Sequence, residues 1–347
     1  MTARQTPLDK LAQVETNIDS PSLIVVGKGT KLSDKKVQKS RARRKTITDS
    51  LILNLIKVAK KKGRSSKTIQ TYWNTYHCQR RVYGFDGKLH GKYCKNRICT
   101  ICLGIRKAET IRKYYPVLSK WPDCQFLTLT IKSIPAKELA RYTKGMNKIM
   151  VQIIAKYRRR HLRGRDVQLK GVRSFECNFN PKTRKYNPHF HLLLETEEMA
   201  NKLRNEWLKV FPKKHVNPLA QKIRKVDNLE HDLVEVIKYG SKIFTDSDLT
   251  RKSRKMISPF VYVSALDNIL NAFSGHRLFQ NFGFKLPPDS KFYPEKNIQL
   301  TNQYDEWVYK SVLRDWLNLS SGEMLSGYEP TAELMDILTN KINLEFE

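Results

Sequence analysis

Two histidines separated by one apolar residue, His189 and His191, stand in the segment PHFHLLLE. On a β-strand, residues two apart project from the same face, so both imidazoles are expected on one side of a sheet. Phe190, Leu192 and Leu194 would then form the opposite, core-facing side. Two imidazoles side by side can bind one divalent metal ion. The spacing therefore predicts half of a metal site on the open face of a sheet.

A third ligand is expected from the preceding strand. Glu176 lies in SFECNF, where Phe175 and Cys177 are expected to face the core, and the turn-forming segment NPKTRKYNP predicts a hairpin with the histidine strand. In a suitable register Glu176 reaches His189 and His191. Two nitrogens and one carboxylate leave open positions for a substrate, and they suit Mn²⁺, Zn²⁺ or hydrated Mg²⁺. A His-x-His pair alone is common by chance, so the pairing with Glu176 is what favours metal binding.

A candidate nucleophile, Tyr239, lies in LEHDLVEVIKYGSKIF, a segment with helical periodicity. Glu235 precedes it by one helical turn on the polar face, and Lys238 and Lys242 flank it. A phenol has a pKa of about 10, so attack at neutral pH needs a metal ion or a lysine to stabilise the phenolate. Taken alone, a tyrosine that merely covers part of the core is the commoner case.

Four cysteines, Cys78, Cys94, Cys99 and Cys102, fall within 25 residues. Four thiolates satisfy tetrahedral zinc, and a closed set of four ligands is structural rather than catalytic. Cys78 would join across a hairpin centred on GFDG, and His77 competes with it as the fourth ligand. The other two cysteines, Cys124 and Cys177, are expected to be reduced core residues.

Five motifs in chain order resemble one known family. They are CKNRICTIC, FLTLTI, RSFECNFN, NPHFHLLLE and EVIKYGSK. This order is similar to that of the rolling-circle plasmid replication initiators of the single-tyrosine type, within the His-hydrophobic-His (HUH) endonuclease superfamily. The later stretch LNAFSGHRLFQNFGFK also has Arg, Gly and Lys at matching places, and the resemblance spans about residues 70–286. One departure is Thr100, where the family usually has proline, and this change should not affect ligation.

The resemblance implies a role for each candidate residue. Tyr239 matches the nicking tyrosine, and Glu235 matches a carboxylate used when replication terminates. Mg²⁺ or Mn²⁺ would bind the metal-site residues, Zn²⁺ would bind the cysteines, and basic side chains would contact DNA. The metal-site residues are His189, His191 and Glu176, and the candidate DNA contacts are Lys238, Lys242, Arg277 and Lys285.

The activity implied is metal-assisted cleavage of one DNA strand. Tyr239 would attack the scissile phosphate, leaving a 5′-phosphotyrosyl link and a free 3′-hydroxyl that primes rolling-circle replication. The expected substrate is origin DNA, single-stranded or extruded from a hairpin, because a sheet face holds a flexible strand readily. By the same resemblance, the partners are the host replication helicase and polymerase.

The composition agrees with a polyanionic partner. The 347 residues include 65 Lys and Arg against 33 Asp and Glu, a net charge of +32, which favours binding to phosphates. No apolar run approaches the roughly 20 residues of a membrane-spanning helix, and the N-terminus lacks the layout of a secretory signal. These features predict a cytoplasmic protein with no membrane partner.

The elements that must position these residues form an α+β fold. We expect strands at 125–132, 170–179 and 188–195, and helices at 46–62, 136–161, 197–209 and 229–244. The antiparallel sheet of an HUH-endonuclease domain would carry helices on one face and DNA on the other, with a small zinc-binding segment before it. The expected domains are a flexible basic arm (1–45) that adds mainly salt-sensitive affinity, a helix and zinc segment (46–115), the nickase domain (116–290) and a helical tail (291–347).

Two other interpretations stay open from the sequence. A relaxase or transposase of the same superfamily would use the same chemistry with a different motif order. A zinc-containing DNA-binding regulator would use none of it: Tyr239 would be a surface residue, and the histidines would bind no metal.

Overall fold

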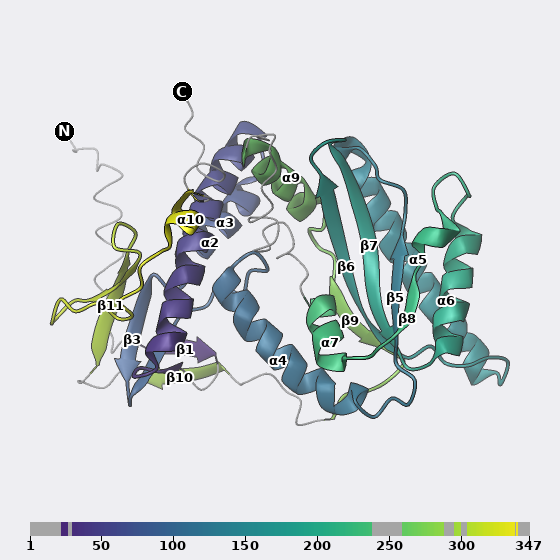
Figure 1. Ribbon diagram of the computed structural model, residues 1–347, viewed down its shortest axis with the longest axis horizontal. Coiled ribbons are helices and arrows are strands. Elements are labelled where there is room, and N and C mark those ends of the chain that lie inside the picture. Colours follow the sequence, from purple (N-terminus) through teal and green to yellow (C-terminus); the bar gives the residue numbers. More distant parts are fainter. Residues whose placement is uncertain are drawn as a thin grey trace, which may run out of the picture. The chain divides into compact units, whose positions relative to one another are not determined.

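The computed structural model describes residues 22–26, 30–237, 259–287, 295–299, 304–336 and 338. The chain divides into two compact units, each assembled from separate stretches of sequence. The first unit comprises Met1–Arg43, His77–Tyr93 and Phe292–Glu329, and the second unit comprises Arg44–Tyr76, Cys94–Lys291 and Pro330–Glu347. Figure 1 labels the helices and strands of both units.

The second unit is built on a five-stranded antiparallel sheet in the order β8-β5-β7-β6-β9. Its longest strands, β6 and β7, form the predicted hairpin around the turn that ends at Arg184, a residue with φ of 52°. Alternating apolar side chains on these strands give the sheet one apolar face that packs in the core, as the sequence predicted. The strands are β5 (Gln125–Thr130), β6 (Gly171–Asn180), β7 (Lys185–Leu194), β8 (Ile223–Lys225) and β9 (Phe279–Phe282).

Three helices cover this core face: α5 (Ala136–Leu162), α6 (Glu197–Val210) and α9 (Pro259–Ala272). Phe175 and Phe190 stack with ring centroids 4.2 Å apart, and Trp207 of α6 meets Phe190 edge-on at 5.8 Å. All three rings are fully buried, and burying such a side chain stabilises the fold by about 1.5–3 kcal/mol. These contacts confirm that Phe175, Phe190, Leu192 and Leu194 face the core.

Two more helices lie on the opposite face of the sheet: α4 (Thr100–Leu118) and α7 (Leu229–Ile237). Their apolar residues pack on Phe126, Val172 and Leu193, which project from the face that carries His189 and His191. The expectation that helices cover one face only is therefore wrong. The physical reason is that this face is apolar at one end and polar at the other, and only the apolar end needs cover. In Figure 1, α7 lies against the sheet near β9, on the side away from α5.

A buried charge network joins α9 to the two N-terminal helices, α2 (Lys35–Lys61) and α3 (Ser66–Tyr76). Asp267 is fully buried and accepts from Lys62 at 3.2 Å, Arg64 at 2.8 Å and the Tyr72 hydroxyl at 3.2 Å. Burial and the neighbouring Asp267 carboxylate raise the pKa of Tyr72, so its hydroxyl stays a donor. The carboxylate thus holds two cations and one phenol together.

Replacing Asp267 with alanine is expected to lower the free energy of unfolding by about 3–5 kcal/mol, because it leaves two partly buried cations without their counter-charge. Urea unfolding followed by tryptophan fluorescence measures this change. The exposed Asp227, changed to alanine, is the matched control and should move the midpoint little. Equal small shifts for both variants would contradict a stabilising role of the network.

The first unit has its own five-stranded sheet in the order β12-β11-β3-β4-β2. The predicted hairpin appears as β3 and β4, joined by Asp86 and Gly87, both with positive φ, as a tight two-residue hairpin turn requires. A second pair, β1 with β10, also belongs to this unit. The strands are β1 (Ser22–Val26), β2 (Thr30–Lys31), β3 (Arg81–Phe85), β4 (Lys88–Gly91), β10 (Glu295–Gln299), β11 (Asp305–Lys310) and β12 (Asp315–Asn318).

Two of the expected domains differ from the structure. The stretch 291–347, expected to be a helical tail, contains β10, β11 and β12, and its one α-helix among the described residues is the short α10 (Ala332–Asp336). Trp307, Tyr309 and Trp316 bury their rings in the first unit's core, which fixes this stretch as sheet. Its partner strand β3 lies more than 200 residues earlier, so no local pattern reveals the pairing.

The basic stretch expected to be a flexible arm up to residue 45 is also partly ordered. From Lys35 it is helical, and Gln38, Arg41, Ala42 and Lys45 form its buried side. The charged groups of Arg41 and Lys45 have partners. The Arg41 guanidinium donates to Thr30 Oγ1 at 2.7 Å, and the Lys45 ammonium forms an ion pair with Asp49 at 2.7 Å. Long basic side chains can bury their stems in this way, so a basic composition did not prevent a packed helix.

Candidate functional site

His189 and His191 lie side by side on β7, on the face that α4 and α7 leave uncovered at its polar end. Their ring centroids are 4.7 Å apart, and the rings are nearly perpendicular. His189 is buried and His191 is partly exposed. The neighbouring strands supply polar residues at this level: Thr128 on β5 pairs with His191, and Ser174 on β6 pairs with it from the other side. The strand pleat therefore gathers polar groups around both rings.

Hydrogen bonds orient the two imidazoles. His189 Nδ1 lies 2.9 Å from the Asn187 carbonyl oxygen, so Nδ1 carries the proton and donates, and Nε2 is the nitrogen with a lone pair. His191 Nδ1 lies 3.2 Å from Thr128 Oγ1. A second hydrogen bond on the far ring nitrogen is the usual arrangement for metal-binding histidines, because it fixes the tautomer and the ring direction.

Glu176 completes the predicted group. It is directly opposite His189 in the β6–β7 ladder, and its Oε2 lies 3.8 Å from His189 Nε2. The other carboxylate oxygen accepts from Ser174 Oγ at 3.1 Å. One ligand atom from each of Glu176, His189 and His191 lies within 4.8 Å of the others. Donors about 2.1 Å from a shared ion are about 3–4 Å apart, so this set fits one divalent metal ion.

The helix with the candidate nucleophile is only partly described. Leu233, Val236 and Ile237 of α7 are buried in an apolar cluster with residues of the sheet, and Glu235 is partly exposed. Tyr239, Lys238 and Lys242 lie outside the described residues. The remaining candidate DNA contacts, Arg277 and Lys285, flank β9 and are exposed.

Three of the four candidate zinc ligands come together in the second unit. Cys94, Cys99 and Cys102 have ligand atoms within 4.8 Å of one another, and Cys94 Sγ lies 3.7 Å from Cys102 Sγ. Zn–S bonds of about 2.3 Å in a tetrahedron put sulfurs about 3.8 Å apart, so the spacing fits a metal such as zinc. Cys99 occupies the N-cap position of α4, directly before its first residue, Thr100.

The remaining thiols follow the prediction for core residues. Cys124 and Cys177 are buried in apolar clusters away from the three cysteines, and burial raises the pKa of the Cys124 thiol to about 12. The candidate fourth ligands belong to the first unit: Cys78 is buried, and His77 is exposed. Which of the two completes a tetrahedral site stays a prediction.

Comparison with known proteins identifies the family. The family model described as "Replication protein" matches residues 87–283, more than half of the chain, and this range contains the histidine pair, Glu176 and Cys94–Cys102. The chain belongs to the Replication protein family. It is 30% identical over 184 residues to "Protein rep" of Staphylococcus aureus, an alignment that covers 47% of this chain and 74% of that protein.

A second relative, "Protein rep" of Streptococcus pneumoniae serotype 2 (strain D39 / NCTC 7466), is 27% identical over 134 residues, which cover 36% of this chain and 40% of that protein. No solved structure matches the chain significantly. These findings confirm the predicted resemblance to the rolling-circle plasmid replication initiators. Among the residues described in this replication protein, no helix is long and apolar enough to cross a membrane.

Sequence reasoning did not assign the groups that orient the metal site. Thr128, Ser174 and the Asn187 carbonyl each hold a predicted ligand in place. A signal for the first two was available. Thr128 alternates with core leucines on its strand, and Ser174 is two residues from Glu176, so the alternation of side chains along a strand places both on the metal-site face. Only the strand register, which the structure supplies, pairs each of them with His191.

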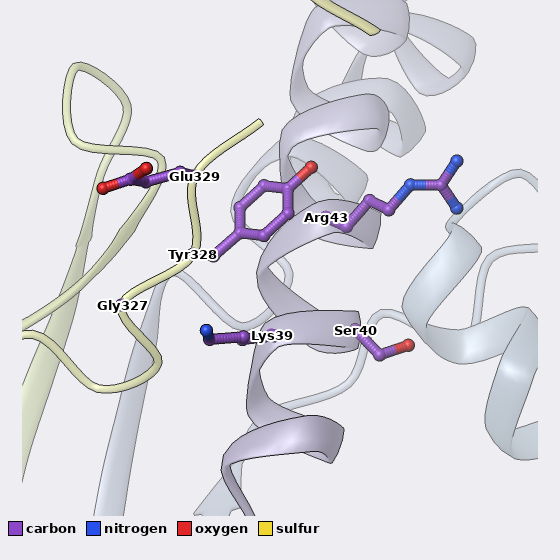
Figure 2. Close-up of a pocket in the computed structure, with 6 residues that line it drawn as sticks. All are labelled: Lys39, Ser40, Arg43, Gly327, Tyr328 and Glu329. Atoms are coloured by element: carbon purple, nitrogen blue, oxygen red, sulfur yellow. The ribbon is translucent and has the colours of Figure 1, made fainter. Parts of the chain in front are cut away.

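The first unit of the replication protein carries a separate pocket, shown in Figure 2, whose charged lining residues are Lys39, Arg43 and Glu329. It is lined by Lys39, Ser40 and Arg43 of α2 and by a loop that contains Tyr328. In Figure 2 the Tyr328 ring points toward the helix and Lys39 extends toward the loop, whereas Ser40 and Arg43 extend to the other side of the helix. Buried Asp315 fixes this loop by accepting from the backbone of Ser326 at 3.0 Å and of Gly327 at 2.7 Å. Cations beside an aromatic ring suit contact with nucleic acid. The salt-sensitive DNA affinity expected of the basic N-terminal stretch stays a prediction, and part of this stretch belongs to the helix α2.

Removing one thiol of the cysteine group is expected to release the metal. The Cys99→Ser variant should fall from one zinc per chain to nearly none, because three remaining ligands hold the ion far more weakly. Elemental analysis of purified protein measures this content. Cys177→Ala is the matched control, since its thiol is buried outside the group, and should keep its zinc. Wild-type protein without zinc, or a zinc content unchanged in Cys99→Ser, would contradict a structural zinc site.

Proposed function

We propose that this replication protein starts plasmid replication by nicking one strand of origin DNA. The observation that carries the proposal is the group formed by Glu176, His189 and His191, whose ligand atoms lie within 4.8 Å of one another on one face of the sheet. Family membership supplies the biological setting, a plasmid origin, and the structural group supplies the means of activating a phosphate. Two imidazoles and a carboxylate are rarely held this close together in a folded protein without a ligand, because each of the three groups loses hydration on burial.

The residues around the metal site have distinct roles in this proposal. Glu176, His189 and His191 would hold Mg²⁺ or Mn²⁺, which supplies Lewis-acid polarisation of a phosphate oxygen. Thr128 and the Asn187 carbonyl fix the two imidazoles, and Ser174 fixes the carboxylate. A DNA strand would lie at this polar end of the sheet face, beyond the residues that α4 and α7 pack against.

The covalent step is assigned to Tyr239 by resemblance. Its phenol loses a proton, and the phenolate oxygen forms a bond to phosphorus while the bond from phosphorus to the 3′ oxygen breaks. That oxygen takes up a proton and becomes the 3′-hydroxyl primer for the host polymerase. α7, which precedes Tyr239 in the sequence, packs on the metal-site face of the sheet, and this supports the assignment. Lys238 and Lys242 would stabilise negative charge on the phosphate.

Glu235 is assigned the second covalent step, at termination. A single tyrosine is occupied by its link to DNA, so release needs another group that removes a proton from water. Glu235 is four residues before Tyr239 in the sequence and is partly exposed, which suits a general base. Arg277 and Lys285 are exposed beside β9 and would contact the DNA backbone. Cys78 would complete the zinc site, since it is buried and His77 is exposed.

The proposal is tested with single-stranded DNA from the plasmid origin, labelled at the 3′ end and incubated with Mg²⁺ or Mn²⁺. We expect a labelled band at the mass of protein plus DNA on a denaturing gel, and its loss in EDTA. A 5′-labelled copy should yield a shorter fragment that a polymerase can extend. Tight metal-independent binding without any cleavage would instead indicate a DNA-binding regulator.

A further inference from the structure

A pocket of about 410 Å³ opens at the β8 edge of the second unit's sheet, and no role has yet been given to it. It lies between β5, α6 and the segment that leads into β8, and these elements are grouped at one side of the sheet in Figure 1. Its lining residues are Phe126, Thr128, Arg204, Pro218, Leu219, Gln221, Lys222, Ile223 and Arg224.

The pocket adjoins the metal site through two shared residues. Thr128 lines the pocket and bonds His191 Nδ1 at 3.2 Å. Phe126 also lines it, and its ring centroid is 5.2 Å from that of His191. A single side chain, Thr128 or Phe126, therefore separates the pocket from a metal-site histidine.

The charge of the lining favours an anion. It includes Arg204, Lys222 and Arg224 and no carboxylate. Arg224 is held by Asp232 at 2.7 Å and lies over the Phe126 ring at 4.4 Å, so it forms part of the wall. Arg204 Nε is buried and has no hydrogen-bond acceptor within the described part of the chain. A buried donor beside a cavity that has no acceptor is stabilised when a ligand oxygen accepts from it.

The rim of the pocket presents an apolar side chain on a fixed backbone. Leu219 is 86% exposed on the short helix η2 (Pro218–Ala220). Asn217 Oδ1 accepts from the Leu219 amide at 3.0 Å, and buried Gln221 bonds both the Asn217 carbonyl and the Thr130 amide. The leucine is thus held outward by a rigid turn, although exposure of an apolar side chain gains nothing in water.

We propose that this pocket binds one nucleotide of the DNA strand next to the phosphate that is cut. The base would lie between Leu219 and the Phe126 end of the pocket, and the phosphate would accept from Arg204 and Lys222. Apolar faces flanked by cations match the chemistry of a nucleotide in single-stranded DNA. This inference rests on the proposed nicking function, and it adds a base-contacting subsite to it.

The test measures, by fluorescence anisotropy in EDTA, the affinity of the protein for two labelled DNA probes of equal charge. One probe is twelve-nucleotide oligo(dT), and the other is an abasic strand of the same length. Wild type should prefer oligo(dT), and Leu219→Ala should reduce that preference at least about threefold, since it removes a base contact. Leu162→Ala is the matched control, an exposed leucine at the end of α5, and should leave the preference unchanged.

A double variant, Arg204→Ala with Lys222→Ala, probes the phosphate contact. It should weaken binding of both probes about tenfold and lower the salt dependence by about 0.7 per lost contact. The matched control removes two exposed arginines of α5, Arg158 and Arg159, and should have a smaller effect. An unchanged base preference in Leu219→Ala, equal effects of test and control variants, or no binding of oligo(dT) by wild type would each overturn the pocket proposal.

The outcome is separable from that of the proposed function, because binding in EDTA does not require cleavage. Wild type that shows the expected base preference but never cuts DNA would support the pocket proposal and contradict the nicking proposal. Wild type that cuts DNA but shows no base preference dependent on Leu219 would support the nicking proposal and contradict the pocket proposal.

Discussion

Replacing Tyr239 with phenylalanine is expected to abolish cleavage of single-stranded origin DNA and to leave DNA binding nearly unchanged. The substitution removes one oxygen, the atom proposed to form the bond to phosphorus, and keeps the aromatic ring. Without a nucleophile no covalent intermediate forms, so the rate should fall at least about a thousandfold. Single-turnover cleavage of 3′-labelled DNA, resolved on a denaturing gel, measures both the rate and the covalent product.

Two comparisons make this result specific. Tyr115→Phe removes the hydroxyl of an exposed tyrosine on α4 and should cleave as wild type does. Glu235→Gln should still form the covalent product but release it more slowly, because only the later water attack needs a base. A covalent band of normal intensity from Tyr239→Phe would show that another side chain is the nucleophile.

Local sequence patterns predicted the sheet that carries the candidate site. The hairpin of β6 and β7 has alternating apolar residues and a turn rich in proline, asparagine and lysine between its strands. Both the hairpin itself and the face on which each of its side chains lies could therefore be predicted from local sequence. The pairing of Glu176 with His189 depends on the register that this turn sets. The metal-site group could therefore be anticipated from about 20 consecutive residues.

Features that depend on distant contacts could not be predicted in the same way. β11 pairs with β3 across more than 200 residues, and Trp307 is buried only in that pairing. α4 and α7 cover the apolar end of the metal-site face because Val172 and Leu193 meet there from different strands. The pocket around Leu219 arises from α6, β5 and η2 together, and no local pattern reveals that these three segments meet.

The metal site makes the second large prediction. His189→Ala should reduce cleavage at least about a hundredfold at limiting Mg²⁺ or Mn²⁺, because it removes one of the two nitrogen ligands of the proposed ion. Thr128→Val should reduce it less, about tenfold, since it removes only the hydrogen bond that orients His191. Titrating Mn²⁺ at fixed DNA measures both the apparent metal affinity and the maximal rate.

The dependence on metal concentration distinguishes ligation from a general loss of structure. If His189 is a ligand, more Mn²⁺ should restore part of the cleavage by His189→Ala, because the two remaining ligands still bind weakly. His161→Ala, which removes an exposed imidazole at the end of α5, is the matched control and should keep the wild-type titration. Binding of uncut DNA in EDTA should be the same for His189→Ala and His161→Ala, since Glu176, His189 and His191 act on the phosphate through the ion. A His189→Ala variant with normal metal dependence would show that the group on β6 and β7 does not hold the catalytic metal.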